Sequence, residues 1–175
     1  MKIFSSKIGE IDIDKNSVIT FKEGLLGFEH LKKFVLYEHK PGSLLKWLIP
    51  INDRNVSFII IRPVQFIYNY KLKLAIDDSK FLDIQDANDA LIYSIVVVPS
   101  DPKKMTANLQ GPIVINSKNK IGKQVISSNS KHQLKHYILE EMQKNSQKLK
   151  ENLAPVNENE IRLLNTPKAI QGGSQ

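Results

Sequence analysis

The stretch MTANLQGPIVIN (Met105–Asn116), followed after a polar turn by GKQVI (Gly122–Ile126), decides the fold of this chain. Residues Leu109–Ile115 and Lys123–Ile126 are rich in β-branched side chains, which favour strands. Between them, Ser117–Lys120 supplies the polar residues that are typical of a tight connection. The pattern therefore predicts a β-hairpin, and we expect the rest of the chain to consist of similar short strands.

Short apolar segments separated by turn residues recur along the preceding part of the chain. We predict strands at 8–14, 18–21, 34–37, 45–49, 56–61, 70–74 and 91–98. The first two are expected to pair as a hairpin, and residues 77–90 are expected to form short helices. About eight or nine short strands at regular spacing predict a mainly β protein, namely a small antiparallel β-barrel-like domain with short helices.

The apolar period changes near the C-terminus. Between residues 130 and 153, Leu134, Ile138 and Met142 recur every four residues with Tyr137 beside them, which predicts an amphipathic helix. We expect this apolar stripe to dock on the barrel or on a partner. The predicted organisation is a β-barrel domain at residues 1–129, a basic amphipathic helical extension at 130–153 and a flexible tail at 154–175.

Composition narrows the classes of function. The chain has 175 residues and no cysteine, which excludes disulfides, thiolate metal ligands and thiol nucleophiles. Its apolar runs, such as Phe58–Ile61, are far shorter than the roughly 20 residues that span a bilayer. The N-terminus lacks the apolar core of a signal peptide. We therefore expect a cytoplasmic protein that does not enter a membrane.

The net charge of +7 is unevenly distributed. Residues 1–117 hold 15 Lys and Arg against 13 Asp and Glu, a balance of +2. Residues 118–150 hold 8 against 2, a balance of +6, and residues 151–175 hold 2 against 3, a balance of −1. The positive charge is therefore a local property of the segment that follows the predicted hairpin.

Two histidines are the strongest indication of a metal site. His132 and His136 lie four residues apart, as in the first half of some zinc sites. No glutamate lies between them, and the neighbouring Lys131 and Lys135 would repel a cation. We interpret the pair as part of a solvated basic helix face, and we expect no metal and no cofactor.

The sequence lacks the motifs of phosphate-binding loops, dinucleotide sites, hydrolase nucleophile elbows and zinc proteases. We therefore expect no enzymatic activity and no small-molecule substrate. A nucleic-acid-binding β-barrel acting alone is the alternative, because such a module combines exposed aromatic and basic side chains on a strand face. Tyr68, Tyr70, Lys71 and Lys73 come nearest to that pattern, although we do not expect direct nucleic-acid binding.

The stretch ITFKEGLLGFE (Ile19–Glu29) near the start of the chain belongs with the opening motif. Together with Met105–Asn116 and Gly122–Val125, it resembles the FliW family of flagellar assembly factors. The resemblance runs from about residue 1 to about residue 127. Lys22 and Leu26 stand where family members often have proline, and residues 130–175 continue past the point where most relatives end.

The resemblance implies a β-barrel-like protein with no cofactor and no known catalysis. FliW proteins bind flagellin in the cytoplasm in a chaperone-like manner. When flagellin is exported, the freed protein binds CsrA, an RNA-binding translational regulator, and relieves its repression of flagellin synthesis. This chain is therefore expected to have flagellin and CsrA as partners and to couple flagellin synthesis to export during flagellum assembly.

We expect the partner-binding residues to lie in the two signature stretches. Each stretch combines charged or amide side chains with an apolar one, as protein interfaces do. The expected residues are Glu23, Phe28 and Glu29 in the first stretch, and Met105, Thr106, Asn108, Lys123 and Gln124 in the second.

Overall fold

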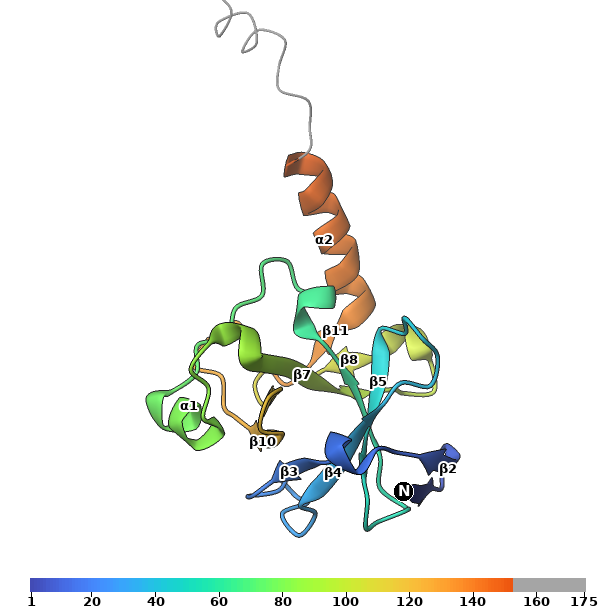
Figure 1. Ribbon diagram of the computed structural model, residues 1–175. Coiled ribbons are helices and arrows are strands. Elements are labelled where there is room, and N and C mark those ends of the chain that lie inside the picture. Colours follow the sequence, from blue (N-terminus) through green and yellow to red (C-terminus); the bar gives the residue numbers. More distant parts are fainter. Residues whose placement is uncertain (153–175) are drawn as a thin grey trace, which may run out of the picture.

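The computed structural model describes residues 1–152, and these form a mainly β protein with two α-helices (Figure 1). The predicted tail at 154–175 lies outside the described residues. The strands are β1 (Lys2–Ser5), β2 (Gly9–Asp12), β3 (Ile19–Phe21), β4 (Lys33–Tyr37), β5 (Leu45–Pro50), β6 (Phe58–Ile61), β7 (Ala90–Val97), β8 (Thr106–Ala107), β9 (Ile113–Asn116), β10 (Ile121–Gln124) and β11 (His136–Tyr137). The helices are α1 (Ile76–Leu82) and α2 (Ile138–Asn152), with 3-10 turns η1 (Lys15–Ser17), η2 (Pro63–Gln65), η3 (Ala87–Asp89) and η4 (Pro102–Lys104).

Seven strands close into a barrel in the order β7, β6, β5, β4, β3, β10, β9 and back to β7. Strand β7 closes the ring because it has eight residues and pairs with different strands along its length. Its first half, Ala90–Tyr93, pairs with β9, and Ser94–Val96 pairs with β6. Strand β8 then pairs with the end of β7, and β11 pairs with β8. The predicted β-barrel with short helices is confirmed.

The hairpin predicted from the opening motif is also confirmed, since β9 and β10 pair antiparallel with Gly122 opposite Ile115. The hairpin predicted between residues 8–14 and 18–21 is wrong. Strand β2 pairs with β1, whereas β3 pairs antiparallel with β4 and parallel with β10. Because β3 is an interior strand of the barrel, both of its edges are occupied and β2 has to pair elsewhere.

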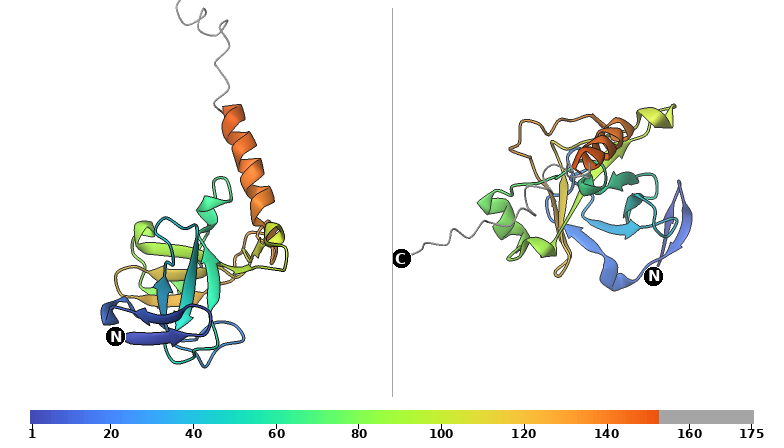
Figure 2. Two further views of the ribbon diagram at one scale, coloured as in Figure 1. Left: turned by 90° about the vertical axis from the view of Figure 1, so that its right-hand side faces the viewer. Right: turned by 90° about the horizontal axis from the view of Figure 1, so that it is seen from above.

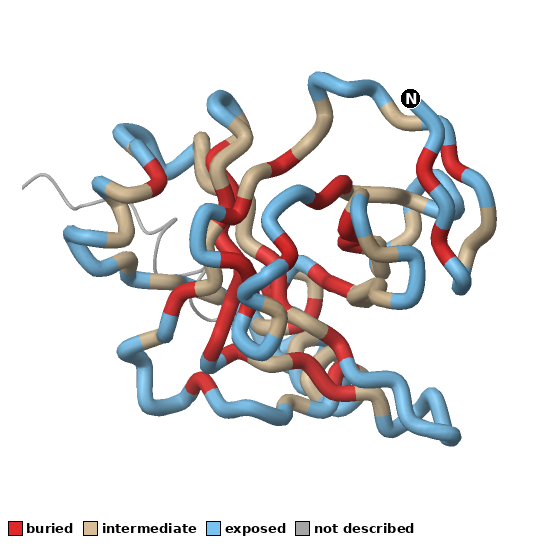
Figure 3. The backbone as a smooth tube through the Cα atoms, turned by 90° about the horizontal axis from the view of Figure 1, so that it is seen from below, coloured by how far each residue is buried: buried red, intermediate tan, exposed pale blue. Residues whose placement is uncertain are grey.

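The barrel interior is filled by aromatic and branched side chains. Phe21 and Phe34 are fully buried and pack edge to face, with ring centroids 5.1 Å apart. Leu48, Ile60 and Ile113 belong to the same cluster and are also fully buried. Figure 3 shows buried residues gathered mainly in the middle of the molecule and exposed residues mostly on the outer bends of the chain. The buried side chains of this cluster come from strands around the ring, namely β3, β4, β5, β6, β7 and β9, which places this core inside it.

Three further clusters attach the other elements to the outside of the barrel. The β1–β2 hairpin packs Ile3 and Ile11 against Val35 and Ile49. Helix α1 buries Leu82 beside β9 and β10. The remaining cluster joins α2 to the region around β7 and β8. Each peripheral element is therefore held by a small apolar contact.

The strand predicted at 70–74 is wrong, since these described residues form no strand. Leu72 and Leu74 pack against the cluster that surrounds Leu82. Alternate residues of the segment are thus partly buried, which reproduces the period of a strand although the backbone pairs with none. The segment connects η2 to α1.

The predicted C-terminal helix exists, but it begins at Ile138 rather than near residue 130. Residues 136–137 form β11 instead, and Leu134 is 62% exposed. Ile138 is buried and packs with Met142, so half of the predicted apolar stripe docks on the barrel. Figures 1 and 2 show α2 projecting away from the barrel beyond this contact.

Helix α2 itself is not basic. Its charged residues are Glu140, Glu141, Lys144, Lys148, Lys150 and Glu151, three of each sign. The lysines responsible for the local positive charge lie mostly before the helix. No helix among residues 1–152 is long and apolar enough to cross a membrane.

Candidate functional site

The loop between β3 and β4 has a backbone shape that its glycines determine. Gly24 adopts a φ of +76°, and a Cβ there would lie 2.6 Å from the Cα of Glu29. The Gly27 N–H donates to the Glu29 carboxylate at 2.9 Å, and Phe28 packs edge to face on Phe58 with centroids 5.0 Å apart. Phe28 is thus the internal anchor of the loop, and Leu26 at its tip is 66% exposed.

Gln124 joins the two signature stretches. Its Oε1 accepts a hydrogen bond from the N–H of Leu26 at 3.0 Å, and its Nε2 donates to the carbonyl of Gly111 at 3.0 Å. The N–H of Gly111 in turn donates to the side chain of Asn108 at 2.9 Å. Since each end of the Gln124 amide is used, the side chain fixes the β3–β4 loop against β10. Segments about one hundred residues apart in the sequence therefore form one surface.

Lys123 connects the same surface to α1. Its Nζ lies 3.0 Å from Asp78 and 3.4 Å from Glu23, and 4.6 Å from the ring centroid of Phe81. Its side chain is 20% exposed. The hydrogen bond to Asp78 raises the pKa of Lys123, with Glu23 adding to the effect and burial opposing it. Lys123 is therefore a charged anchor, and Glu23 is its solvent-facing partner.

The carboxylate of Glu29 is held in its ionised form. Hydrogen bonds from the backbone N–H of Gly27 and from its own N–H lower the pKa of Glu29, and nearby His30 and Lys32 contribute less. The residue is exposed. It therefore presents a permanent negative charge at neutral pH beside the tip of the loop.

Two exposed apolar residues, Leu26 and Ile126, belong to the same stretches of sequence and are not among the site residues that the sequence predicts. Leu26 is 66% exposed, and its N–H donates to Gln124; Ile126 is 65% exposed and follows Gln124 two residues along the chain. An apolar residue in a turn between Gly24 and Gly27 was the available signal for Leu26. We call the exposed parts of Glu23, Leu26, Glu29, Lys123, Gln124 and Ile126 the loop surface.

Met105 and Thr106 have a different environment from the loop surface. Thr106 is 8% exposed and pairs with Tyr137 of β11. Met105 packs in the cluster that contains Ile138, and its carbonyl accepts the Ile138 N–H at 3.2 Å. These two predicted site residues therefore support the attachment of β11 and α2 to the barrel.

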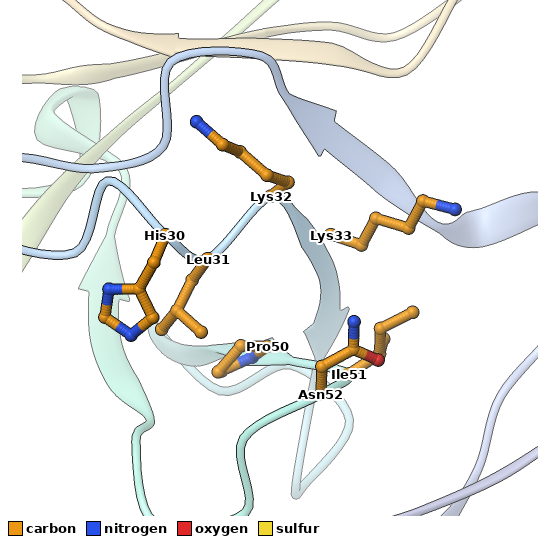
Figure 4. A pocket seen from close by; sticks show the side chains of 7 residues that line it. All are labelled: His30, Leu31, Lys32, Lys33, Pro50, Ile51 and Asn52. Carbon is orange, nitrogen blue, oxygen red and sulfur yellow. The ribbon is translucent and has the colours of Figure 1, made fainter.

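A small pocket of about 230 Å³ lies between the start of β4 and the end of β5. It is lined by His30, Lys32 and Lys33 together with Leu31 and residues 50–52. Figure 4 shows Lys32 and Lys33 extending in different directions. The Nζ of Lys32 donates to the carbonyl of Lys22 at 2.9 Å. The basic groups therefore do not converge on a point where an anion could bind.

The histidines are not on a solvated helix face, so that interpretation is wrong. His132 is 8% exposed and stacks on Tyr70 with ring centroids 5.0 Å apart. His136 lies in β11. Among residues 1–152, no group of three or more His, Cys, Asp or Glu side chains is placed to hold a metal ion.

The strand face considered for nucleic acids does not form. Tyr70 is partly buried against His132, and burial raises the pKa of its phenol to about 12. Tyr68 does not lie on a strand. It lies in the connection after η2 and contacts Lys148 and Asn152 of α2. The pattern of aromatic and basic residues instead serves contacts within the chain.

Comparison with known proteins identifies the relatives of this chain. The family model described as "FliW protein" matches residues 2–138. A "Flagellar assembly factor FliW" from Clostridium botulinum (strain Alaska E43 / Type E3) is 39% identical over 140 residues, which cover 79% of this chain and 99% of that protein. One from Thermoanaerobacter pseudethanolicus (strain ATCC 33223 / 39E) is 41% identical over 143 residues, covering 81% of this chain and 95% of that protein.

A solved structure agrees with these sequence matches. The structure described as "Crystal structure of the flagellar assembly factor FliW" superposes with a TM-score of 0.73 at 32% identity, covering 79% of this chain and 96% of that chain. The family match ends at residue 138, where α2 begins, so nearly all of α2 lies outside it. On the evidence of sequence and fold together, this chain belongs to the FliW family of flagellar assembly factors.

Proposed function

We propose that this protein binds flagellin in the cytoplasm as a chaperone-like factor and antagonises CsrA, so that flagellin synthesis follows export. Membership of the FliW family supports the role in flagellar assembly. The observation that carries the proposal is the Gln124 side chain, which holds both signature stretches in one surface. The protein acts by binding and does not catalyse a reaction.

The chemistry of the loop surface suits a protein partner. Leu26 and Ile126 present apolar side chains to solvent, and the same two stretches of sequence carry the charged side chains of Glu23, Glu29 and Lys123. An apolar centre with a polar rim is the usual composition of a protein interface. Because Gln124 and Phe28 already hold the loop in shape, little conformational entropy is lost when a partner binds.

The expected site residues then divide by role. Glu23, Glu29 and Lys123 contact the partner, whereas Gln124, Asn108 and Phe28 hold the loop surface in shape. Met105 and Thr106 act indirectly, through the attachment of β11 and α2.

The switch between partners requires thermodynamic coupling. If flagellin weakens the binding of CsrA by some factor, CsrA must weaken the binding of flagellin by the same factor. The concentration of the free protein then falls as flagellin that has not been exported accumulates. This regulation follows from the two affinities and needs no chemical step.

The test is a calorimetric titration of the full-length protein with flagellin monomer from the same organism, repeated in the presence of its CsrA. We expect binding of flagellin that CsrA weakens. Absence of binding to a folded protein would contradict the proposal. In that case, an RNA titration at several salt concentrations would test the nucleic-acid alternative. That alternative predicts that the logarithm of the RNA affinity falls linearly with the logarithm of the salt concentration.

Substitution of the exposed apolar residues locates the site. Leu26→Ser and Ile126→Ser are each expected to weaken partner binding about tenfold, which corresponds to about 1.4 kcal/mol. Leu149→Ser is the matched control, because Leu149 is 51% exposed but lies on α2, outside the matched family segment. Unchanged affinity in both loop variants would place the interface elsewhere on the protein.

A further inference from the structure

The loop that joins the barrel to α2, residues 125–135, is fastened to the end of the β8–β9 connection. The carbonyl of Gln133 accepts hydrogen bonds from the N–H groups of Leu109 at 3.0 Å and Gln110 at 3.3 Å. The N–H of Ser127 donates to the carbonyl of Gln110 at 2.8 Å. Residues 136–138 then continue directly into β11 and the first turn of α2. The position of α2 therefore depends on this loop.

His132 is the buried side chain at the centre of the loop, and its hydrogen bonds require the neutral imidazole. The Oδ1 of Asn129 accepts the Lys131 N–H at 3.0 Å, which orients the amide so that its Nδ2 faces the Nε2 of His132 at 3.3 Å. Since Nδ2 is a donor, Nε2 must be unprotonated, and the proton of the ring lies on Nδ1. That proton is directed at the hydroxyl of Ser127, 2.6 Å away.

His136 makes the same demand. Its Nε2 lies 2.9 Å from the backbone N–H of Gln133, which can only donate. A proton on this nitrogen would place two donors against each other. The imidazoles of His132 in the loop and His136 in β11 therefore both accept hydrogen bonds through Nε2, and a proton on either Nε2 removes a contact that holds the loop.

The cavity beside His132 contains few groups that would stabilise a protonated ring. The rings face a cavity of about 440 Å³ whose walls come from the 67–71 segment, the loop itself and α2. The ionisable groups that line it besides the two histidines are Tyr70, Lys71, Lys131 and Glu141. Glu141 is the only acid of this set, and it lies 3.7 Å from His136 and 3.4 Å from Lys144. Within residues 1–152, no carboxylate pairs with His132.

We propose that the loop and its two histidines form a latch that holds α2 on the barrel at neutral pH, and that protonation of His132 releases it. The elements expected to undock are the loop, β11 and α2, because they depend on the hydrogen bonds of the two rings. The seven-stranded barrel contains neither histidine and remains closed. The latch lies beyond the loop surface and is independent of the identity of the partners.

The direction of the pH dependence follows from burial. Desolvation, assisted by the nearby His136, lowers the pKa of His132 below its ordinary value of 6.5. The unfolded loop therefore binds the proton more tightly than the docked loop. The latch contributes its full stability above pH 6.5, and this contribution is lost as the pH falls from 6.5 through the lower pKa of the docked state.

The experiment uses the full-length protein at pH values from about 7.5 to about 5, which bracket the ordinary histidine pKa of about 6.5. Nitrogen-15 NMR of the histidine rings is expected to find His132 neutral with its proton on Nδ1 at the upper end. Hydrogen exchange, corrected for its intrinsic pH dependence, is expected to accelerate in the loop and α2 as the pH falls. The exchange rate in the loop and α2 is expected to rise about tenfold for each pH unit by which docking lowers the pKa of His132. Exchange in β5 and β6 is expected to stay constant.

Asn129→Asp provides the decisive variant. Residue 129 is exposed, and a carboxylate of the same shape would accept a hydrogen bond from protonated Nε2 while still accepting the Lys131 N–H. The variant is expected to stay latched to a lower pH than the unsubstituted protein. His39→Gln is the control, because His39 is exposed and lies outside the loop, and it should leave the opening pH unchanged.

Three results would overturn the proposal. One is a protonated His132, or a proton on its Nε2, at neutral pH. Another is exchange in the loop and α2 that does not accelerate on acidification. The third is an opening pH in Asn129→Asp that is the same as or higher than in the unsubstituted protein.

Discussion

At the scale of single residues, Gly122 explains why the second signature stretch contains a glycine in a strand. A Cβ at this position would lie 2.5 to 2.9 Å from three ring atoms of Phe21. Phe21 is fully buried in the barrel and cannot move without displacing Phe34. The glycine is therefore required by the close approach of a ring, and the backbone of β10 pairs with both β3 and β9 at this point.

The variant Gly122→Ala is expected to destabilise the protein by about 1–3 kcal/mol, because the added methyl overpacks the core. Chemical denaturation would measure the change in the free energy of unfolding. The double variant Phe21→Leu/Gly122→Ala tests the cause, since a smaller side chain makes room for the methyl. The two substitutions should be less destabilising together than the sum of their separate effects. Additive effects would contradict this explanation.

At the scale of elements, Lys123 is one of the contacts that attach α1 to the barrel wall. Lys123 of β10 pairs with Asp78 of α1, and its ammonium lies over the ring of Phe81 in the same helix. Both charged side chains are largely shielded, with 20% and 19% of their surfaces exposed. The helix is short, so this contact and the burial of Leu82 hold it in place.

Lys123→Met keeps the aliphatic stem but removes the charge, and it leaves Asp78 without its partner. We expect a loss of stability of about 1–2 kcal/mol, since a shielded carboxylate loses a hydrogen bond from a cation. Because the pair raises the pKa of Lys123, the difference from the unsubstituted protein should be present below pH 10.5 and disappear as the pH rises through the raised pKa. Urea denaturation across this range would measure it.

Lys118→Met serves as the control for Lys123→Met. Lys118 also pairs with an acid, Asp89 at 2.7 Å, but its side chain is 73% exposed. Solvent screens such a pair, so its removal should change stability little. Equal losses in the two variants would show that burial does not determine the strength of the Lys123 contact.

The docking of α2 depends on its first turn. Ile138→Ala removes a side chain that is 1% exposed, and we expect docking of α2 to weaken by about 2–5 kcal/mol. Since an isolated helix of this length is marginal in water, far-UV circular dichroism should report a loss of helix. Limited proteolysis should cut within residues 139–152 more rapidly. Leu134→Ala is the control, since Leu134 is 62% exposed, and helix loss there would contradict the assignment.

At the scale of the whole molecule, the barrel is closed by strands that all lie between residues 19 and 124. The C-terminal segment adds β11 and α2 to this ring through the cluster that contains Ile138 and Met142. The molecule is therefore organised as a closed barrel with an attached extension, and this division predicts that the two parts differ in stability.

A chain ending at residue 137 is expected to fold as a closed barrel. Its melting temperature should fall by about 5–15 °C, because the cluster that joins α2 to β7 and β8 loses the side chains of Ile138 and Met142. Thermal unfolding followed by near-UV circular dichroism of Trp47 would measure this. A chain that lacks a cooperative transition would show that α2 is part of the folding unit.

Local patterns in the sequence determined much of this protein. The β9–β10 hairpin, α1 and the mainly β fold follow from β-branched runs and turn residues, and these signals are local. The expected partner-binding residues were also taken from the two signature stretches, and they stay a prediction. The strand prediction at 70–74 failed for a physical reason. Partial burial of alternate side chains produces the period of a strand even though the backbone has no pairing partner.

The tertiary structure alone decided which segments meet. The parallel pairing of β3 with β10, the Gln124 hydrogen bonds to Leu26 and Gly111, and the burial of His132 all join residues distant in sequence. No local pattern encodes them, since pairing in a closed barrel depends on which edges other strands leave free. The start of α2 was decided in the same way, because β8 offered an edge to residues 136–137 and so delayed the helix to Ile138.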